Sequence, residues 1–223
     1  MKALLCLALV WNLVAVTASP ASERNDPRIL VIGDSHAVGP YGRLLADELK
    51  KVSERTSLYA SCGTVASSWF TGSKTKCGFY FHTEGGSILS GKIGNTPKLP
   101  GMLRTLAPDL LVVELSGNYT NGYDHATAVE DMRKIVRLIK DSSVACLWVS
   151  APDARVNTPT RPKLFSWVME AVGDRCTVLD GRAYTHYPEH EGDGIHYSRE
   201  SDVRAWVDAT VSEVRHILNR ESF

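Results

Sequence analysis

The sequence has 223 residues, of which 43% are hydrophobic, 22% charged and 8% aromatic. This is the composition of an ordinary globular protein, and it excludes collagen-like, low-complexity and intrinsically disordered chains. Basic and acidic residues each number 25, so the formal net charge is zero. Because nucleic acids and anionic membranes bind basic surfaces, this balance gives no reason to expect a nucleic-acid partner.

The first 21 residues are typical of a secretory signal peptide. Lys2 supplies the positive start, residues 3–16 are apolar apart from Asn12, and small residues follow. The apolar run is shorter than the roughly 20 residues that a transmembrane helix needs. We therefore predict cleavage near residues 18–21, export to the periplasm or the extracellular space, and no stable membrane insertion.

Removal of this segment takes away Cys6 and leaves four cysteines, which are Cys62, Cys77, Cys146 and Cys176. An even number of cysteines in an exported protein indicates two disulfides, and four cysteines allow three pairings. We favour Cys62–Cys77, whose loop of about 15 residues is worth roughly 3 kcal/mol, and Cys146–Cys176, which links two predicted strands. A zinc site is the alternative, but no Cys-x-x-Cys or matching histidine pair accompanies the cysteines.

Residues 22–223 are predicted to form one domain, since about 200 residues suffice for a single core and no linker or repeat divides them. Apolar, β-branched runs indicate strands, and helical spacing of apolar residues indicates helices. The predicted strands cover residues 28–32, 57–60, 109–115, 144–149 and 176–179, and the predicted helices cover residues 41–52, 126–139, 164–172 and 201–218. This alternation predicts a three-layer α/β/α fold around about five mainly parallel strands.

Residues 64–100 are rich in glycine and serine and show little periodicity, so we expect a long loop there. Long loops in compact domains are often lids or binding loops. The aromatic residues of this segment include Trp69 and Tyr80, which we take as candidate substrate contacts because aromatic rings stack well on sugars. The alternative is a small aromatic core held by the Cys62–Cys77 disulfide.

Polar residues with catalytic potential follow the predicted strands, and ligands bind beyond the carboxyl ends of parallel strands. Ser35 follows the first strand in Gly33-Asp34-Ser35-His36, where the start of a helix would stabilise an oxyanion. Asp193 and His196 stand three residues apart before the last helix. A carboxylate can orient an imidazole that accepts the serine proton, so the three residues predict a nucleophilic serine. Taken singly, the motifs are also explained by a helix cap and a surface loop.

These blocks resemble the SGNH (GDSL-type) hydrolase superfamily, which carries serine in a Gly-Asp-Ser block, then a glycine, an asparagine and Asp-x-x-His. The resemblance implies a flavodoxin-like α/β/α fold with Ser35, Asp193 and His196 as the catalytic residues. It also implies an oxyanion hole formed by the Ser35 N–H, the Gly63 N–H and the Asn118 side chain. No cofactor is implied.

The chain departs from the family pattern at three positions. His36 replaces the common leucine, and it is a third candidate substrate contact or a simple packing residue. Ser116 and Tyr119 replace the usual glycine and aspartate around Asn118, so Asn121 is the other candidate for the oxyanion asparagine. Gly-Asp-Ser-His-Ala also resembles the SGNH domains of membrane O-acyltransferases that modify bacterial polysaccharides.

Further signals carry less weight. Asn118-Tyr119-Thr120 is a glycosylation sequon, which we interpret as accidental because a glycan would block the oxyanion role of Asn118. His186, His190 and His196 lie near carboxylates, but their spacing matches no familiar ligand pattern, so we predict no metal. Arg155 and Arg182 follow predicted strands and are weak candidates for binding an anionic substrate.

The prediction that best unites these features is an exported serine esterase. It would hydrolyse short-chain esters, foremost O-acetyl groups on carbohydrate, or another small ester, through a covalent acyl-enzyme. A polysaccharide O-acetyltransferase with the same three catalytic residues is the alternative. A third hypothesis is a non-catalytic carbohydrate-binding module on the same scaffold. The complete set of Ser35, Asp193 and His196 argues against it. The sequence does not indicate the oligomeric state.

Overall fold

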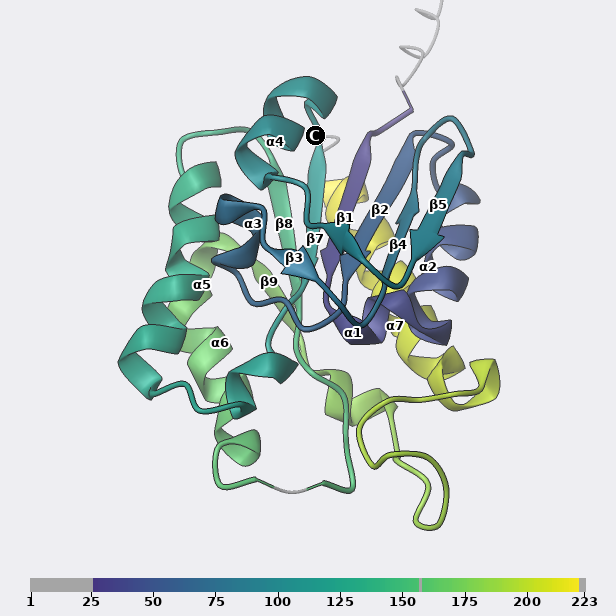
Figure 1. Ribbon diagram of the computed structural model, residues 1–223. Helices are drawn as coiled ribbons and strands as arrows, with labels where there is room; N and C mark the ends of the chain where they lie inside the picture. The colour runs from purple at the N-terminus through teal and green to yellow at the C-terminus, as the bar shows by residue number, and fades with distance from the viewer. Residues whose placement is uncertain (1–25, 157, 221–223) are drawn as a thin grey trace, which may run out of the picture.

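The computed structural model describes residues 26–156 and 158–220, so the predicted signal peptide lies outside the described residues. At its centre is a seven-stranded sheet in the order β5-β4-β2-β1-β7-β8-β9 (Figure 1). The strands of this sheet are β1 (Ile29–Gly33), β2 (Thr56–Ser61), β4 (Phe79–His82), β5 (Ile88–Gly91), β7 (Leu110–Glu114), β8 (Ala145–Val149) and β9 (Thr177–Leu179). Five of them run parallel, whereas β4 and β5 are antiparallel to their neighbours.

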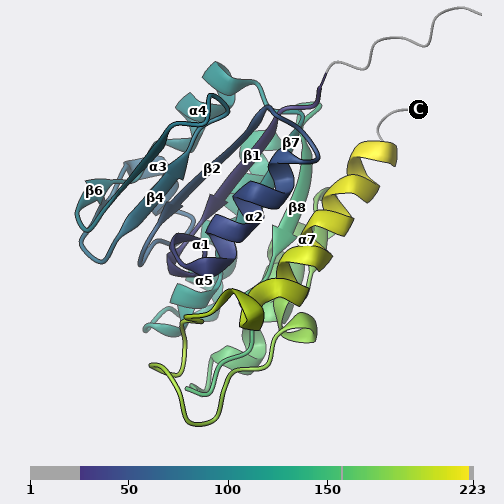
Figure 2. The same cartoon turned by 90° about the vertical axis from the view of Figure 1, so that its right-hand side faces the viewer.

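Helices cover both faces of the sheet (Figure 2). They are α1 (Ser35–Val38), α2 (Pro40–Lys50), α3 (Ser68–Thr71), α4 (Leu99–Leu106), α5 (His125–Ile139), α6 (Leu164–Val172) and α7 (Glu200–Arg220). Residues of α2 and α7 form the core on one face, and residues of α3, α4, α5 and α6 form the core on the other. The predicted three-layer α/β/α architecture is therefore confirmed.

The central strand β1 shows why the sequence folds in this way. Ile29 and Val31 pack toward α2 and α7, whereas Leu30 and Ile32 pack toward the opposite helices, and all four are fully buried. A strand that is covered on both faces must be apolar at every position, since successive side chains point to opposite sides. That requirement explains the unbroken apolar run at the start of the domain.

The segment 64–100 differs from the prediction of a long loop. It contains α3, the strands β4 and β5, the start of α4, and a separate two-stranded sheet of β3 (Lys74–Thr75) and β6 (Gly94–Asn95). The strands β4 and β5 extend the parallel sheet from five strands to seven. These strands are only two to four residues long, and such short strands are stabilised by cross-strand partners that local periodicity does not reveal.

Both predicted disulfides are present. Cys62–Cys77 joins the end of β2 to the residues before β4, with 5.5 Å between the Cα atoms. Cys146–Cys176 joins β8 to the residue before β9, with 4.6 Å between the Cα atoms. Within residues 26–156 and 158–220, no helix combines the length and the apolar character needed to cross a membrane.

Candidate active site

Ser35 stands at the carboxyl end of β1, where the chain turns directly into the short helix α1. The Asp34 side chain caps this helix by accepting the His36 backbone N–H at 3.0 Å. The turn requires glycine at position 33, because a Cβ atom there would lie 2.4 Å from the Cβ of Ala37. Ser35 consequently occupies the first position of the helix with its side chain partly exposed at the edge of the sheet.

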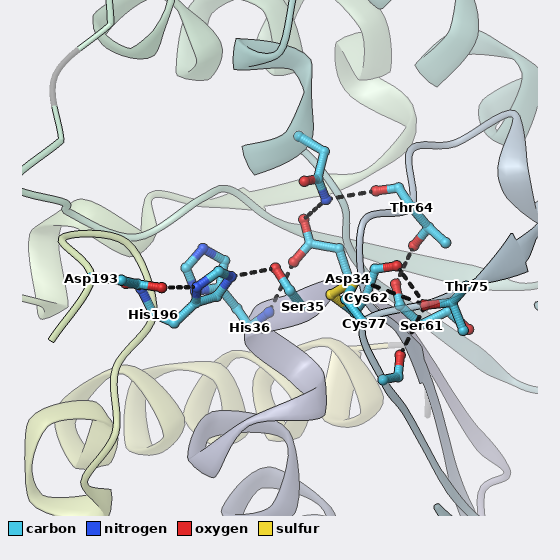
Figure 3. Close-up of a disulfide and its surroundings, with 12 residues drawn as sticks. Asp34, Ser35, His36, Ser61, Cys62, Thr64, Thr75, Cys77, Asp193 and His196 are labelled. Carbon is cyan, nitrogen blue, oxygen red and sulfur yellow. Dashed lines mark hydrogen bonds and ion pairs between the residues drawn. A yellow bond between two sulfur atoms is a disulfide. The ribbon is translucent and has the colours of Figure 1, made fainter. Parts of the chain in front are cut away.

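His196 and Asp193 reach Ser35 from the loop before α7. The Nε2 atom of His196 lies 2.9 Å from the Ser35 Oγ, and its Nδ1 lies 2.6 Å from the Asp193 Oδ2 (Figure 3). Nδ1 therefore donates to the carboxylate, which leaves Nε2 free to accept the proton of the serine hydroxyl. The structure thus brings together three residues that are separated by up to 161 positions in the sequence.

The loop that carries Asp193 and His196 is fixed by its own hydrogen bonds. Asp193 Oδ1 accepts the backbone N–H groups of Ile195 at 2.8 Å and His196 at 2.7 Å. The hydroxyl of Tyr187 accepts the Gly194 N–H at 3.0 Å and donates to the His196 carbonyl at 3.1 Å. No local sequence pattern indicates this role of Tyr187, because the contact depends on the path of the loop.

The same hydrogen bonds keep Asp193 ionised. Burial by itself would raise the pKa of Asp193, but the hydrogen bonds from the His196 side chain and from two backbone N–H groups outweigh it. The pKa of Asp193 is therefore well below its usual range. A permanently charged carboxylate stabilises the imidazolium that forms when His196 takes a proton.

Two backbone donors beside the nucleophile are available to an oxyanion. Among the described residues, neither the Ser35 N–H nor the Gly63 N–H has a hydrogen-bond acceptor. Gly63 has φ of 77°, a left-handed conformation that favours glycine, and it follows β2 at the same edge of the sheet. Backbone N–H groups beside a reacting serine can stabilise a tetrahedral oxyanion, so both groups are available for the predicted role.

Asn118, the third predicted oxyanion donor, has both of its amide hydrogens engaged. Its Nδ2 donates to Asp34 Oδ2 at 3.1 Å and to the Thr64 carbonyl at 2.9 Å. Asn118 lies in the single 3₁₀ turn η1 (Gly117–Thr120) that follows β7, and its amide links this turn to the segments that carry Ser35 and Gly63. For Asn118 to donate to an oxyanion, one of these two hydrogen bonds must be exchanged.

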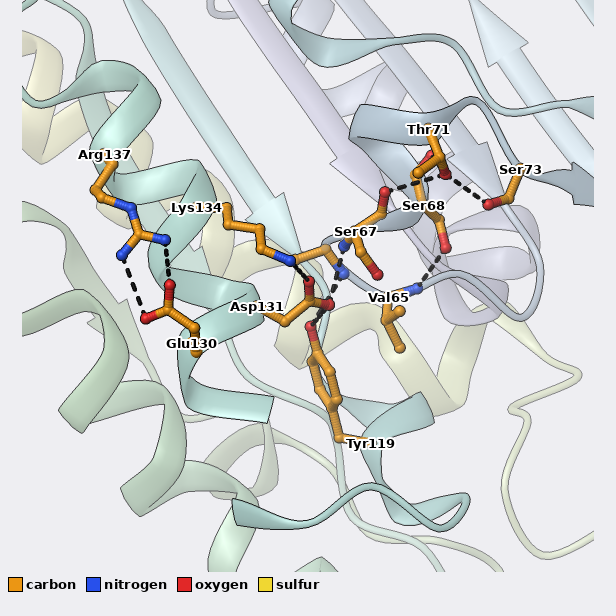
Figure 4. Close-up of polar contacts among 11 residues, drawn as sticks. Val65, Ser67, Ser68, Thr71, Ser73, Tyr119, Glu130, Asp131, Lys134 and Arg137 are labelled. Carbon is orange, nitrogen blue, oxygen red and sulfur yellow. Dashed lines mark hydrogen bonds and ion pairs between the residues drawn. The ribbon is translucent and has the colours of Figure 1, made fainter. Parts of the chain in front are cut away.

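A buried polar network supports the Gly63 and Asn118 side of the site (Figure 4). The Tyr119 hydroxyl donates to Asp131 Oδ2 at 2.8 Å and accepts the Ala66 N–H at 3.1 Å. The same Asp131 oxygen accepts the Ser67 N–H at 2.9 Å, and Lys134 pairs with the other oxygen at 3.1 Å. These hydrogen bonds hold the short segments that follow Gly63 and Asn118 against α5.

Two buried carboxyl groups, those of Asp34 and Glu114, lie next to Ser35, and no sequence motif indicates a role for them. Asp34 is 1% exposed and Glu114, the last residue of β7, is 0% exposed. Burial raises the pKa of Asp34 to about 6, although the hydrogen bond from the His36 N–H opposes this rise. Burial and the neighbouring Asp34 raise the pKa of Glu114 well above its usual value. The raised pKa favours the protonated form of Glu114, which avoids two adjacent buried charges.

The three candidate substrate contacts differ in their placement. Trp69 is 0% exposed within the core formed by α3, α4, α5 and α6, and Tyr80 is 6% exposed, with the Arg43 guanidinium 5.6 Å from its ring centre. Neither ring offers an open face to a sugar, so their burial argues against substrate stacking and fits the alternative of aromatic core residues. His36, in contrast, lies beside His196 at the site, with 5.4 Å between the ring centres.

The remaining sequence candidates lie outside this constellation. Arg155 is engaged by the carbonyls of Glu189 and Gly192, and Arg182 pairs with Asp180 at 2.6 Å, so both cations already have protein partners. His186 and His190 are exposed on the loop before Asp193. The described part of the chain contains no group of three or more His, Cys, Asp or Glu side chains arranged to hold a metal ion.

Comparisons with known proteins agree with this geometry at the level of the fold. No protein-family model and no curated protein matches the sequence. Among solved structures, a psychrotrophic esterase from Pseudoalteromonas sp. has a TM-score of 0.57 at 14% identity, covering 87% of this chain and 100% of that one. A peptidoglycan O-acetylesterase has a TM-score of 0.55 at 14% identity, covering 87% of this chain and 92% of that one.

A carbohydrate esterase of family two from Clostridium thermocellum, in complex with cellohexaose, has a TM-score of 0.53 at 14% identity and covers 90% of this chain and 67% of that one. A GDSL-like lipase from Bacteroides thetaiotaomicron has a TM-score of 0.52 at 14% identity, covering 90% and 94%. The likeness extends over nearly the whole described part of the chain. The chain therefore has the SGNH (GDSL-type) hydrolase fold that its motifs predict.

Proposed function

We propose that this protein is an exported serine esterase that hydrolyses short-chain acyl esters, with O-acetylated carbohydrate as its substrate class. The observation that carries the proposal is the hydrogen-bonded chain from Ser35 Oγ through His196 to Asp193, at 2.9 Å and 2.6 Å. Distances in this range allow the imidazole to take the hydroxyl proton as the serine attacks a carbonyl.

In the first half of the reaction, Ser35 Oγ forms a bond to the carbonyl carbon of the ester while His196 Nε2 accepts the serine proton. The oxygen of the tetrahedral intermediate is stabilised by the N–H groups of Ser35 and Gly63, with Asn118 as a third donor. The bond to the leaving alcohol then breaks, and His196 returns the proton to the alcohol oxygen. The acyl group remains on Ser35.

In the second half, water gives a proton to His196 and its oxygen attacks the acyl carbon. Collapse of the second intermediate breaks the bond to Ser35 Oγ, which recovers its proton from His196. The products are a carboxylic acid and the original enzyme. These reaction steps need no metal or cofactor, because the chain supplies the nucleophile, the group that transfers the proton and the oxyanion donors.

The substrate class is supported by the kind of proteins that share the fold, which include a peptidoglycan O-acetylesterase and a carbohydrate esterase. Export is supported by the two disulfides and by the signal-like pattern of the first 21 residues, since disulfides persist in oxidising compartments. An exported esterase of this kind would meet acetylated polysaccharides of the cell envelope or the surroundings.

The test compares the wild type with Ser35→Ala in the hydrolysis of p-nitrophenyl acetate and in labelling by a phosphonate ester. We expect the wild type to be labelled on Ser35 and the alanine variant to lose about 10⁴-fold or more of kcat/KM. Acetate release from O-acetylated polysaccharides, with and without an acceptor glycan, then separates hydrolysis from transfer. Equal rates for the two proteins and no label on Ser35 would refute the proposal.

A further inference from the structure

The imidazole of His36 lies beside His196, and among the described residues it has no hydrogen-bond partner. His36 is 6% exposed, and its backbone N–H donates a hydrogen bond to Asp34 Oδ1. Within the described part of the chain, no donor or acceptor contacts the nitrogen atoms of its ring. The described side-chain nitrogen and oxygen atoms that are both fully buried and unpartnered do not include those of His36, so its ring nitrogens are accessible to water. A polar atom that faces a small cavity without a protein partner is usually satisfied by water or a ligand.

The His36 ring lines a cavity that also borders both reacting side chains. The cavity has a volume of about 20 Å³, and Ser35, His36 and His196 form one part of its wall. The rest of the wall is mostly apolar and consists of Gly39, Tyr41, Tyr197, Val203 and Trp206. Since one water molecule needs about 10–15 Å³, the cavity suits a molecule of the size of water and is far too small for a sugar.

The surroundings keep the His36 ring neutral. Burial, together with the nearby His196, lowers the pKa of His36 to about 3. A neutral imidazole has one N–H donor and one nitrogen acceptor, so it can both donate to and accept from a water molecule. It does not compete with His196 for the serine proton, because its basicity is too low at neutral pH.

We propose that His36 binds the hydrolytic water in this cavity and orients it toward the acyl group on Ser35. The inference rests on the proposed esterase function and concerns its second half. The water donates one proton to His196 Nε2 while its oxygen forms a bond to the acyl carbon. The bond from that carbon to Ser35 Oγ then breaks, and Oγ takes the proton from His196. Because the cavity admits water and excludes a sugar hydroxyl with its ring, the arrangement favours hydrolysis over acyl transfer.

The experiment measures the fraction of Ser35 that carries an acetyl group during steady-state turnover of p-nitrophenyl acetate, by acid quenching and intact-mass spectrometry. The variants are His36→Leu, which removes both ring nitrogens, and His36→Gln, which restores a donor and an acceptor. His36→Phe replaces the leucine variant if that chain does not fold. The matched control is His82→Leu, since His82 on β4 is also a buried histidine, 3% exposed, with an unpartnered Nδ1.

We expect His36→Leu to accumulate acetyl-enzyme and to lose about tenfold or more in turnover, because a nucleophile that is no longer oriented reacts more slowly. Acylation, measured by the phosphonate labelling rate of Ser35, should change by less than about threefold, since His36 makes no contact that the first half of the reaction uses. His36→Gln should lie between His36→Leu and the wild type, and His82→Leu should match the wild type.

An acetylated fraction in His36→Leu that is equal to or below that of the wild type would overturn the inference. So would an unchanged acetate turnover with a new preference for butyrate esters, which would show that the cavity holds the acyl chain. These outcomes leave the esterase proposal intact. A wild type that neither hydrolyses esters nor labels at Ser35 would instead refute the proposed function, and this inference with it.

Discussion

The sulfur atom of Cys77 lies against Gly63, so that a Cβ atom on Gly63 would stand 3.6 Å from it. Gly63 supplies one of the two free backbone N–H groups beside Ser35. The neighbouring Thr75 hydroxyl donates to the Cys62 carbonyl at 2.9 Å (Figure 3). The Cys62–Cys77 disulfide therefore packs directly against Gly63, a proposed oxyanion donor, whereas Cys146–Cys176 joins β8 and the segment before β9.

This contact predicts that the two disulfides differ in their effect on catalysis. We expect the double variant Cys62→Ala/Cys77→Ala to lose about 3 kcal/mol of stability and also to lose kcat, because the Gly63 N–H is no longer held in place. The measurements are thermal unfolding and kcat for p-nitrophenyl acetate.

The matched control is Cys146→Ala/Cys176→Ala. Its loop is longer, with a sequence separation of 30 against 15, so it should lose at least as much stability. Its kcat below the unfolding transition should stay close to that of the wild type. If both double variants lost activity in proportion to stability, the disulfide beside Gly63 would have no role of its own at the site.

Substitution of Asp193 is expected to lower kcat without a matching loss of stability. Asp193→Asn preserves the shape of the side chain but removes the charge that stabilises the His196 imidazolium and favours the wrong tautomer. We expect kcat to fall by roughly 10⁴-fold with little change in KM. The unfolding temperature should move little, because Asp193 and His196 are about half exposed. A kcat within tenfold of the wild type would mean that another group holds His196.

Much of the fold could be predicted from the sequence because single elements bear strong local patterns. The helix α6 has the predicted bounds, 164–172, since its apolar residues recur at helical spacing, and β1 and β7 each begin with four consecutive apolar residues. The Ser35, Asp193 and His196 triplet could be expected because both motifs follow or precede such elements at the same edge of the sheet.

The rest depends on contacts between distant segments. In β4 three of the four residues are buried, and in β5 all four are exposed, so neither shows the alternation that indicates a strand. The pairing of β4 with β2, and of β5 with β4, arises from cross-strand contacts that no local window contains. Pro100, in the first turn of α4, is a local feature typical of the start of a helix. Likewise, Glu114 within the apolar run of β7 was the one hint of the buried carboxyl pair.

Asn118 predicts a catalytic loss that its neighbour Asn121 does not share. Asn118→Ala removes the proposed third oxyanion donor and the amide that links Asp34 to the Thr64 carbonyl, so kcat should fall by about 10²–10³-fold. Asn121→Ala is the control, because Asn121 is exposed at the end of the same turn. The kcat of each variant, measured by steady-state kinetics, shows which asparagine has the catalytic role. Normal kcat in Asn118→Ala with reduced kcat in Asn121→Ala would reverse the assignment.

Glu114 predicts a pH dependence of stability with a definite sign. Its pKa is raised in the folded state, so the folded chain holds a proton that the unfolded chain releases above its ordinary value of 4.5. The stability linked to Glu114 is therefore complete below that value and declines as the pH rises. Glu114→Gln keeps the neutral shape and removes this dependence. As the pH rises above 4.5, its stability relative to the wild type should therefore rise by up to about 1.4 kcal/mol per pH unit.

Urea unfolding at several pH values measures the difference, and Glu130→Gln is the control. The hydrogen bond from Arg137 lowers the pKa of that exposed carboxylate, so the pH dependence linked to Glu130 has the opposite sign and lies below pH 4.5. Parallel curves for the wild type and Glu114→Gln would show that Glu114 is ionised in the folded protein.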